Sequence, residues 1–117
     1  MASDDETRAE RARNMGSLVL RSRREGDTHV IELLGELDIA GAPSLEEEFL
    51  SVDASDAAEV VCDLRGLQFI DSTGIRLLLM ATDRSAPGRF RIIRGPQQVH
   101  RVFEITDLVK RLPFADG

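Results

Sequence analysis

Two hydroxyl side chains stand side by side in the middle of the chain, between a carboxylate and a glycine. They are Ser72 and Thr73, preceded by Asp71 and followed by Gly74. An apolar, strand-like run ends just before them, and a helix-like run over 75–84 follows. A helix start leaves backbone amides free, which a capping side chain or a phosphate group can satisfy. The residues therefore predict either a helix cap, the more frequent role of such residues, or a phosphorylation site.

The other residues with catalytic potential lack the companions that their chemistry needs. His29 and His100 are far apart in the sequence, and neither has a partner at metal-ligand spacing. Ser72 lacks the Gly-x-Ser-x-Gly elbow of many serine hydrolases, because isoleucine occupies the first glycine position. A Ser–His–Asp arrangement assembled by the fold stays open. We expect no catalytic residue, no metal site and no cofactor.

Two neighbouring side chains in a predicted strand, Cys62 and Asp63, could also be reactive. Asp63 could be the phosphoacceptor of a domain like a response-regulator receiver, which also needs an acidic pair after the first strand and a later lysine. Here arginines follow the first strand, and no lysine lies near 90–94, so the sequence disfavours a receiver. Cys62 stands in an apolar run, which predicts a buried, unreactive thiol.

Composition limits the class of protein. The 117 residues suit one domain, and a hydrophobic content of 42% is ordinary for a globular chain. A formal net charge of −6 disfavours direct binding to nucleic acid. No apolar run approaches the roughly 18 residues of a membrane span, and the N-terminus does not resemble a secretory signal. We therefore expect a cytoplasmic protein without a membrane span.

Hydrophobic patterning predicts seven elements in the order β-β-α-β-α-β-α. The strands are expected at 18–24, 28–34, 60–64 and 90–93, and the helices over 43–52, 75–84 and 96–103. The turn signal at 25–27 joins the first two strands into a hairpin, whereas the later β-α-β units imply parallel neighbours. The predicted fold is an α/β domain with a small mixed sheet packed with helices.

The first predicted helix has a simple amphipathic pattern. Ser44 and Glu47 have the spacing of a capping box. The apolar residues at i, i+4 and i+7 should face the core, and the three consecutive glutamates should form a solvated face. The core positions are Leu45, Phe49 and Val52, and the glutamates are Glu46, Glu47 and Glu48.

The second predicted helix places apolar residues on both of its sides. One side, expected to face the sheet, carries Ile75, Leu78, Leu79 and Thr82, and the other carries Arg76, Leu77, Met80 and Arg84. Leu77 and Met80 should therefore form an exposed binding patch next to Ser72, unless another element covers them. Both interpretations stay open.

Residues 1–16 differ from the rest of the chain. They are polar and charged, and no apolar residue recurs there at helical spacing. We expect a flexible tail or an exposed helical extension at 1–16, followed by a single domain at 17–117.

Several short motifs together resemble the STAS domain of anti-sigma factor antagonists. They occur in the order and spacing of that family, over roughly 18–114. The motifs are Gly35-Glu36-Leu37-Asp38, Ala42-Pro43, the strand from Val60 to Leu64, and Phe69-Ile70-Asp71-Ser72-Thr73-Gly74-Ile75.

The resemblance implies a STAS fold and a partner switch controlled by phosphorylation. In that family the unphosphorylated antagonist binds an anti-sigma factor that is also a serine kinase, which frees the sigma factor. Phosphorylation on the serine of the motif releases the antagonist, and a serine phosphatase resets the system. The resemblance makes Ser72 the expected phosphoacceptor, with Thr73 the less favoured one. The expected partner-binding residues are Asp38, Asp71, Thr73, Gly74, Arg76, Leu77 and Met80.

Two features depart from the family and leave alternatives open. Such domains usually continue with a last helix near the point where this chain ends, and residues 1–16 are extra. The motif hydroxyls would stay unmodified in a STAS scaffold or in an accessory subunit of a stress-sensing or lipid-transport complex. A small hydrolase that uses Ser72 is the third and least favoured alternative.

Overall fold

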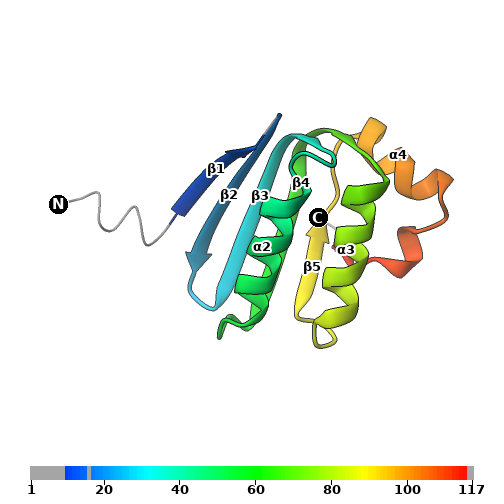
Figure 1. Cartoon of the computed structure of the whole chain (residues 1–117). Helices are drawn as coiled ribbons and strands as arrows, with labels where there is room; N and C mark the ends of the chain where they lie inside the picture. Colours follow the sequence, from blue (N-terminus) through cyan, green and yellow to red (C-terminus); the bar gives the residue numbers. More distant parts are fainter. Residues whose placement is uncertain (1–9, 16, 116–117) are drawn as a thin grey trace.

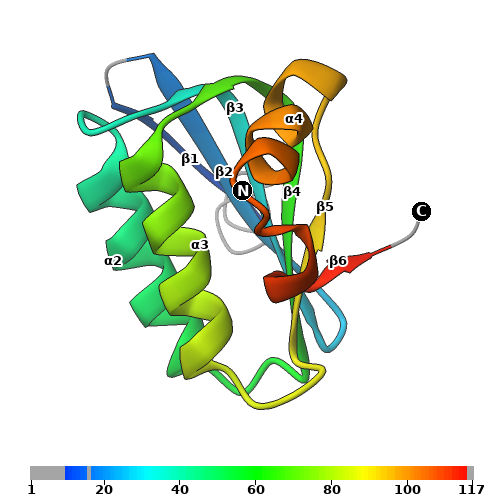
Figure 2. The same cartoon turned by 90° about the vertical axis from the view of Figure 1, so that its right-hand side faces the viewer.

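The computed structural model describes residues 10–15 and 17–115, and it places them in one mixed sheet with helices on both faces (Figures 1 and 2). In chain order the elements are β1 Glu10–Met15, β2 Leu18–Glu25, β3 Thr28–Leu37, α2 Ala42–Asp53, β4 Glu59–Ile70, α3 Ser72–Arg84, β5 Phe90–Ile93, α4 Gln97–Ile105, the 3-10 helix η1 Val109–Arg111 and β6 Phe114–Ala115. The predicted order β-β-α-β-α-β-α is confirmed from β2 to α4.

The six strands lie in the sheet in their sequence order. β1, β2 and β3 are antiparallel neighbours, whereas β3, β4, β5 and β6 run parallel. Helices α2 and α3 lie side by side on one face, and α4 lies on the other (Figure 2). This arrangement brings the carboxyl ends of β3 and β4 to the same edge, where α2 and α3 begin.

The core lies mainly between the sheet and the pair of helices α2 and α3. Alternate residues of β2 and β3 point toward those helices, because successive side chains of a strand face opposite sides. Phe49 of α2 meets Phe90 of β5 edge to face, with ring centroids 5.6 Å apart. Fully buried side chains of the core include Leu18, Leu20, Ile31, Leu33, Leu45, Leu64, Leu78 and Ile92.

The strand at 10–15 differs from the prediction of a flexible or helical tail. β1 pairs with β2 in antiparallel register, from Glu10 opposite Arg23 to Met15 opposite Leu18. Strand pairing satisfies backbone groups whatever the side chains are, so a polar segment can extend a sheet edge without an apolar pattern. The remainder of the predicted tail, 1–9 and 16, lies outside the described residues.

The prediction of a solvated Glu48 is wrong. Glu48 is only 1% exposed, and it lies between α2 and the sheet. The Ser22 hydroxyl donates to Glu48 Oε2 at 2.5 Å and also contacts His29 Nε2, which lies 3.5 Å from the same carboxylate oxygen. One hydroxyl has one proton to donate, so Ser22 accepts from the His29 ring. The buried carboxylate is thus held by polar groups of β2 and β3.

The predicted capping box at Ser44 and Glu47 is also wrong. Helix α2 begins at Ala42, its N-cap Gly41 lies three residues before Ser44, and no described side chain caps it by a hydrogen bond. Ser44 is buried, whereas Glu47 is exposed. Pro43 lies in the first turn as expected, where its missing amide proton costs nothing.

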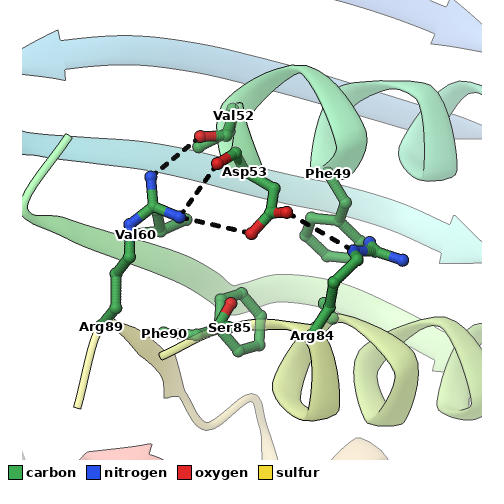
Figure 3. Close-up of a pocket in the computed structure, with 9 residues that line it drawn as sticks. Phe49, Val52, Asp53, Val60, Arg84, Ser85, Arg89 and Phe90 are labelled. Carbon is green, nitrogen blue, oxygen red and sulfur yellow. Dashed lines mark hydrogen bonds and ion pairs between the residues drawn. The ribbon is translucent and has the colours of Figure 1, made fainter. Parts of the chain in front are cut away.

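Arg89, directly before β5, contacts the C-terminal end of α2 (Figure 3). Its guanidinium donates to carbonyl oxygens at the C-terminal end of α2 and just beyond, and to the Asp53 carboxylate. Arg84 at the end of α3 also approaches Asp53, with 3.9 Å between Nε and Oδ2. The free carbonyls of a helix end need such donors. The accepting carbonyls belong to Val52, Asp53, Ser55 and Ala57, at 2.9–3.2 Å.

Candidate functional site

Asp71 caps the helix that carries the candidate site. Its backbone is extended, and its Oδ1 accepts hydrogen bonds from the amides of Thr73 at 2.9 Å and Gly74 at 3.1 Å. Its own amide donates to the Leu37 carbonyl at 3.2 Å, which ties the helix start to the end of β3. The cap is therefore the carboxylate of the motif and neither of its hydroxyls.

Ser72 is the first residue of α3, and its side chain is exposed. Within the part of the chain that the structure describes, its hydroxyl makes no hydrogen bond. Thr73 is half-buried. Of the two motif hydroxyls, the one on Ser72 is thus the more accessible.

Gly74 lets the helix start lie directly against the ends of β3 and β4. A Cβ atom at this position would lie 2.7 Å from Leu37 Cγ and 2.9 Å from Ile70 Cγ1. Such distances are shorter than any real carbon contact, so only glycine fits without displacing a neighbour. Gly74 is buried, and it supports the site by its packing.

Asp38 and Asp71 each follow the last paired residue of two neighbouring strands, so they lie beside each other at the edge of the sheet. Leu37 of β3 pairs with Ile70 of β4, and the two aspartates come next in the chain. Asp38 shapes the turn into α2: its Oδ1 accepts from the Ala40 amide at 3.0 Å. The edge of the sheet at the start of α3 therefore carries two carboxylates.

The two interpretations left open for Leu77 and Met80 divide between these residues: Leu77 is buried, whereas Met80 is exposed. Leu77 is 7% exposed and belongs to the core, because α3 packs against α2 as well as against the sheet (Figure 1). A helix with neighbours on two sides buries a wider arc than one that lies on a sheet alone. Arg76 and Met80 remain on the open side, with Met80 40% exposed.

Two large apolar side chains near the motif are exposed and are absent from the predicted site. Ile39, in the turn after β3, is 74% exposed, and Phe69, near the end of β4, is 48% exposed. Ile39 directly follows Asp38, and Phe69 directly precedes Ile70. The sequence carries a signal for these two residues, because apolar residues stand close to both Asp38 and Asp71. Strand patterning, however, assigns such residues to the core.

The histidines lie away from Ser72. His29 pairs with Val60 at the amino ends of β3 and β4, about 30 Å along the strands from their carboxyl ends. His100 belongs to α4, on the opposite face of the sheet from α3 (Figure 2). The described fold brings no histidine to Ser72, so a Ser–His–Asp arrangement around it is not formed.

Asp63 and Cys62 are held within the sheet. Asp63 lies in the middle of β4, only 4% exposed, and its carboxylate accepts from the Arg65 side chain at 2.9–3.3 Å. Burial opposes ionisation, but hydrogen bonds and charge from Arg65 outweigh it and lower the pKa of Asp63. Burial raises the pKa of the Cys62 thiol, so the expected unreactive cysteine is supported.

Two further observations concern metal binding and membranes. Among residues 17–115, no group of three or more His, Cys, Asp or Glu side chains is placed to hold a metal ion. No described helix is long and apolar enough to cross a membrane.

Comparison with known proteins places the chain in a family. The family model described as "Mlab, STAS domain" matches residues 20–113. The chain belongs to the STAS-domain family. This STAS domain carries its motif residues at the carboxyl edge of the sheet, between β4 and α3. No curated protein matches the chain in sequence.

Solved structures share the fold of this STAS domain. An anti-sigma factor antagonist from Mycobacterium paratuberculosis superposes with a TM-score of 0.78 at 24% identity, covering 86% of this chain and 87% of that one. The anti-sigma factor antagonist SpoIIAA in its unphosphorylated form gives 0.69 at 22%, covering 83% and 88%. The phosphorylated form of the Bacillus protein gives 0.63 at 21%, covering 83% and 91%. At these identities the likeness shows a common fold.

Proposed function

We propose that this STAS-domain protein is an anti-sigma factor antagonist that works as a phosphorylation-controlled partner switch. Its unphosphorylated form binds an anti-sigma factor serine kinase and frees the sigma factor. Phosphorylation of Ser72 releases the kinase, and a serine phosphatase restores the first state. The protein itself is non-catalytic in this scheme and acts in the cytoplasm.

The observation that carries the proposal is the division of roles between Asp71 and Ser72. Asp71 engages the amides of Thr73 and Gly74, so the Ser72 hydroxyl is not needed for capping. It stays exposed at the start of the helix, where a kinase can reach it. Thr73 is half-buried and is the less favoured acceptor.

A phosphate on Ser72 would change the surface rather than the fold. It adds about −1.5 to −2 charges and three acceptor oxygens. Because Asp71 already occupies two of the first amides of α3, the phosphate would face outward, beside the Asp71 carboxylate. A partner that buries this surface would have to desolvate both charges. A loss of ~3 kcal/mol weakens binding by roughly a hundredfold.

The exposed apolar side chains around Ser72 are the proposed contact surface. Ile39, Phe69 and Met80 come from three different elements, and Arg76 adds a positive charge on the open side of α3. Apolar anchors with a polar rim are typical of protein interfaces. Gly74 and Leu77 are buried and would support this surface from below, while Asp38, Asp71 and Thr73 form its edge.

The phosphoswitch is tested by incubating the purified protein and ATP with a serine kinase of the histidine-kinase-like ATPase type, ideally one encoded in a neighbouring reading frame. Mass spectrometry should find one phosphate on Ser72. Ser72→Ala should abolish the modification, and Thr73→Ala is the matched control that should keep it. Equal phosphorylation of the Ser72→Ala variant would refute the site assignment.

Binding of the same kinase tests the switch and its surface. Ser72→Glu should weaken binding, and wild-type affinity in this variant would refute release by charge. Met80→Asp should also weaken binding. Leu50→Asp is the control, because Leu50 is also an exposed apolar residue but lies near the far end of α2. If no such kinase binds the unmodified protein, a STAS scaffold or accessory subunit becomes the better description.

A further inference from the structure

Three exposed side chains follow one another at intervals of four residues along α3. They are Ser72, Arg76 and Met80. Residues four apart in a helix lie one turn apart on the same face, with Cβ atoms about 5–6 Å from each other. The other sides of α3 pack against α2 and the sheet, so this row of residues lies on the open side of the helix. Arg76 is therefore the next exposed side chain along the helix from the proposed phosphoacceptor.

The guanidinium of Arg76 makes no hydrogen bond or ion pair to any residue that the structure describes. Other exposed arginines do have partners: Arg65 pairs with Asp63, and Arg91 pairs with Glu59. A guanidinium carries five donors in a planar fork, which matches the oxygen atoms of a phosphate group. Arg76 thus keeps its donors for a group that the unmodified protein does not contain.

The direction of side chains in a helix brings Arg76 toward Ser72. Long helical side chains lean toward the N-terminus of their helix, so Arg76 covers the turn that begins at Ser72. The second motif hydroxyl has no such neighbour, because the residue four positions after Thr73 is Leu77, which is 7% exposed and belongs to the core. Of the two hydroxyls, the one on Ser72 is the one with a cation at this spacing.

We propose that Arg76 binds the phosphate of phosphorylated Ser72 within the same helix, an inference that rests on the phosphoswitch proposed above. The kinase transfers the γ-phosphoryl group of ATP to Ser72 Oγ, and ADP and the hydroxyl proton are the other products. The phosphate then accepts charge-assisted hydrogen bonds from the fork of Arg76. The Asp71 carboxylate stays on the amides of Thr73 and Gly74, so the helix start keeps its cap.

This internal ion pair also removes Arg76 from the proposed contact surface. In the unmodified protein the guanidinium is available to a partner, between Ser72 and the exposed Met80. After phosphorylation the guanidinium is occupied by the phosphate. The partner therefore meets a new negative charge and loses a positive one in the same step, and release has two linked causes.

Titration of the phosphate by phosphorus nuclear magnetic resonance tests the pair without any kinase. The full chain is made with phosphoserine introduced at position 72 during translation, in wild type, Arg76→Gln and Arg101→Gln. Arg101 is the matched control, because it is exposed on α4, on the opposite face of the sheet (Figure 2). The second pKa of phosphoserine is ordinarily ~6, and a nearby cation lowers it by favouring the dianion.

Arg76→Gln should raise this phosphate pKa by about half a unit relative to wild type, whereas Arg101→Gln should leave it unchanged. Arg76→Lys should keep part of the lowering, since lysine retains the charge but lacks the fork. In ¹⁵N-labelled protein, the Arg76 Nε–H signal should move when position 72 carries phosphoserine. Equal phosphate pKa values in wild type and Arg76→Gln would overturn the inference.

Binding of the serine kinase separates this inference from the proposed function. Arg76→Gln should weaken binding of the unmodified protein by about two- to fivefold, and phosphorylation should then cost less affinity than it does in wild type. Equal losses on phosphorylation in the two proteins would show that capture of Arg76 plays no part in release. If the phosphate titration shows the pair but no such kinase binds, the proposed function fails while the ion pair stands.

Discussion

The carboxylate of Asp71 accepts a hydrogen bond from the backbone amide of Thr73 at 2.9 Å. From the motif alone, a hydroxyl could serve either as the helix cap or as a phosphorylation site. The contact shows that the Asp71 side chain caps the helix, so the exposed Ser72 hydroxyl is not needed as a cap. The Ser72 side chain, one residue further on, is exposed and makes no hydrogen bond to a described residue. Capping and modification can therefore coexist at one helix start.

Removal of the cap should destabilise the protein modestly. Asp71→Ala leaves the amides of Thr73 and Gly74 without their acceptor, and we expect the free energy of unfolding to fall by ~1 kcal/mol. Asp71→Asn should retain most of that stability, since asparagine also caps. Urea denaturation measures both. Ser72→Ala should change stability by less than about 0.5 kcal/mol, and a loss as large as that of Asp71→Ala would show that Ser72 is a structural residue.

A methyl group at position 74 should be poorly tolerated. Gly74→Ala places a Cβ 2.7 Å from Leu37 Cγ, so α3 must shift, and we expect a cost of ~1–3 kcal/mol in thermal or urea unfolding. In a double-mutant cycle, Leu37→Ala should relieve part of this cost, because it removes the colliding atoms. Simple additivity of the two changes would argue that the close contact is not the cause.

Arg89 should contribute more to stability than other surface arginines. Arg89→Lys keeps the charge but cannot donate to four carbonyls and a carboxylate together, and we expect a loss of ~2 kcal/mol. Arg91→Lys is the control on the same strand, where a single exposed ion pair to Glu59 should be worth less than about 1 kcal/mol. Equal losses in the two variants would contradict the role of Arg89 as a clamp on the end of α2.

Acid should remove the contribution of Asp63. The pKa of Asp63 is lowered in the folded state, so the folded protein binds fewer protons there than the unfolded chain does. Its contribution is fully present above the unfolded pKa, ~3.9, and is lost as the pH falls through the lower folded pKa. The stability difference between wild type and Asp63→Asn should be constant above about pH 5 and decline in stronger acid. If the stability difference between the two proteins instead grew as the pH fell, the contact with Arg65 would not lower the pKa of Asp63.

The buried position of Glu48 shows where sequence patterning stops short. Glu48 lies three residues after Leu45 and four before Val52, so the helical period alone places it on the core side. Its charge predicts a solvated position instead. Burial is tolerable because the Ser22 hydroxyl and the His29 ring contact the carboxylate. They belong to β2 and β3 and stand 26 and 19 residues before Glu48 in the chain. No local rule joins these residues.

Leu77 and Phe69 illustrate the same limit in opposite directions. The helical period places Leu77 on the side of α3 away from the sheet, yet Leu77 is buried in the core, and α3 has α2 as a second neighbour besides the sheet. Phe69 stands in an apolar strand, yet its side chain is 48% exposed. Whether an apolar residue becomes core or contact surface depends on which elements pack beside it.

The sequence by itself determined the order of the strands and helices from β2 to α4, the hairpin of β2 and β3, and the position of the motif at a helix start. Those features follow from local period, turn residues and glycine. Only the tertiary structure decided that Asp71 is the cap, that the Ser72 side chain is exposed and that Ile39 and Phe69 join Met80 as exposed apolar residues. These outcomes depend on contacts between segments far apart in the chain, which no local pattern specifies.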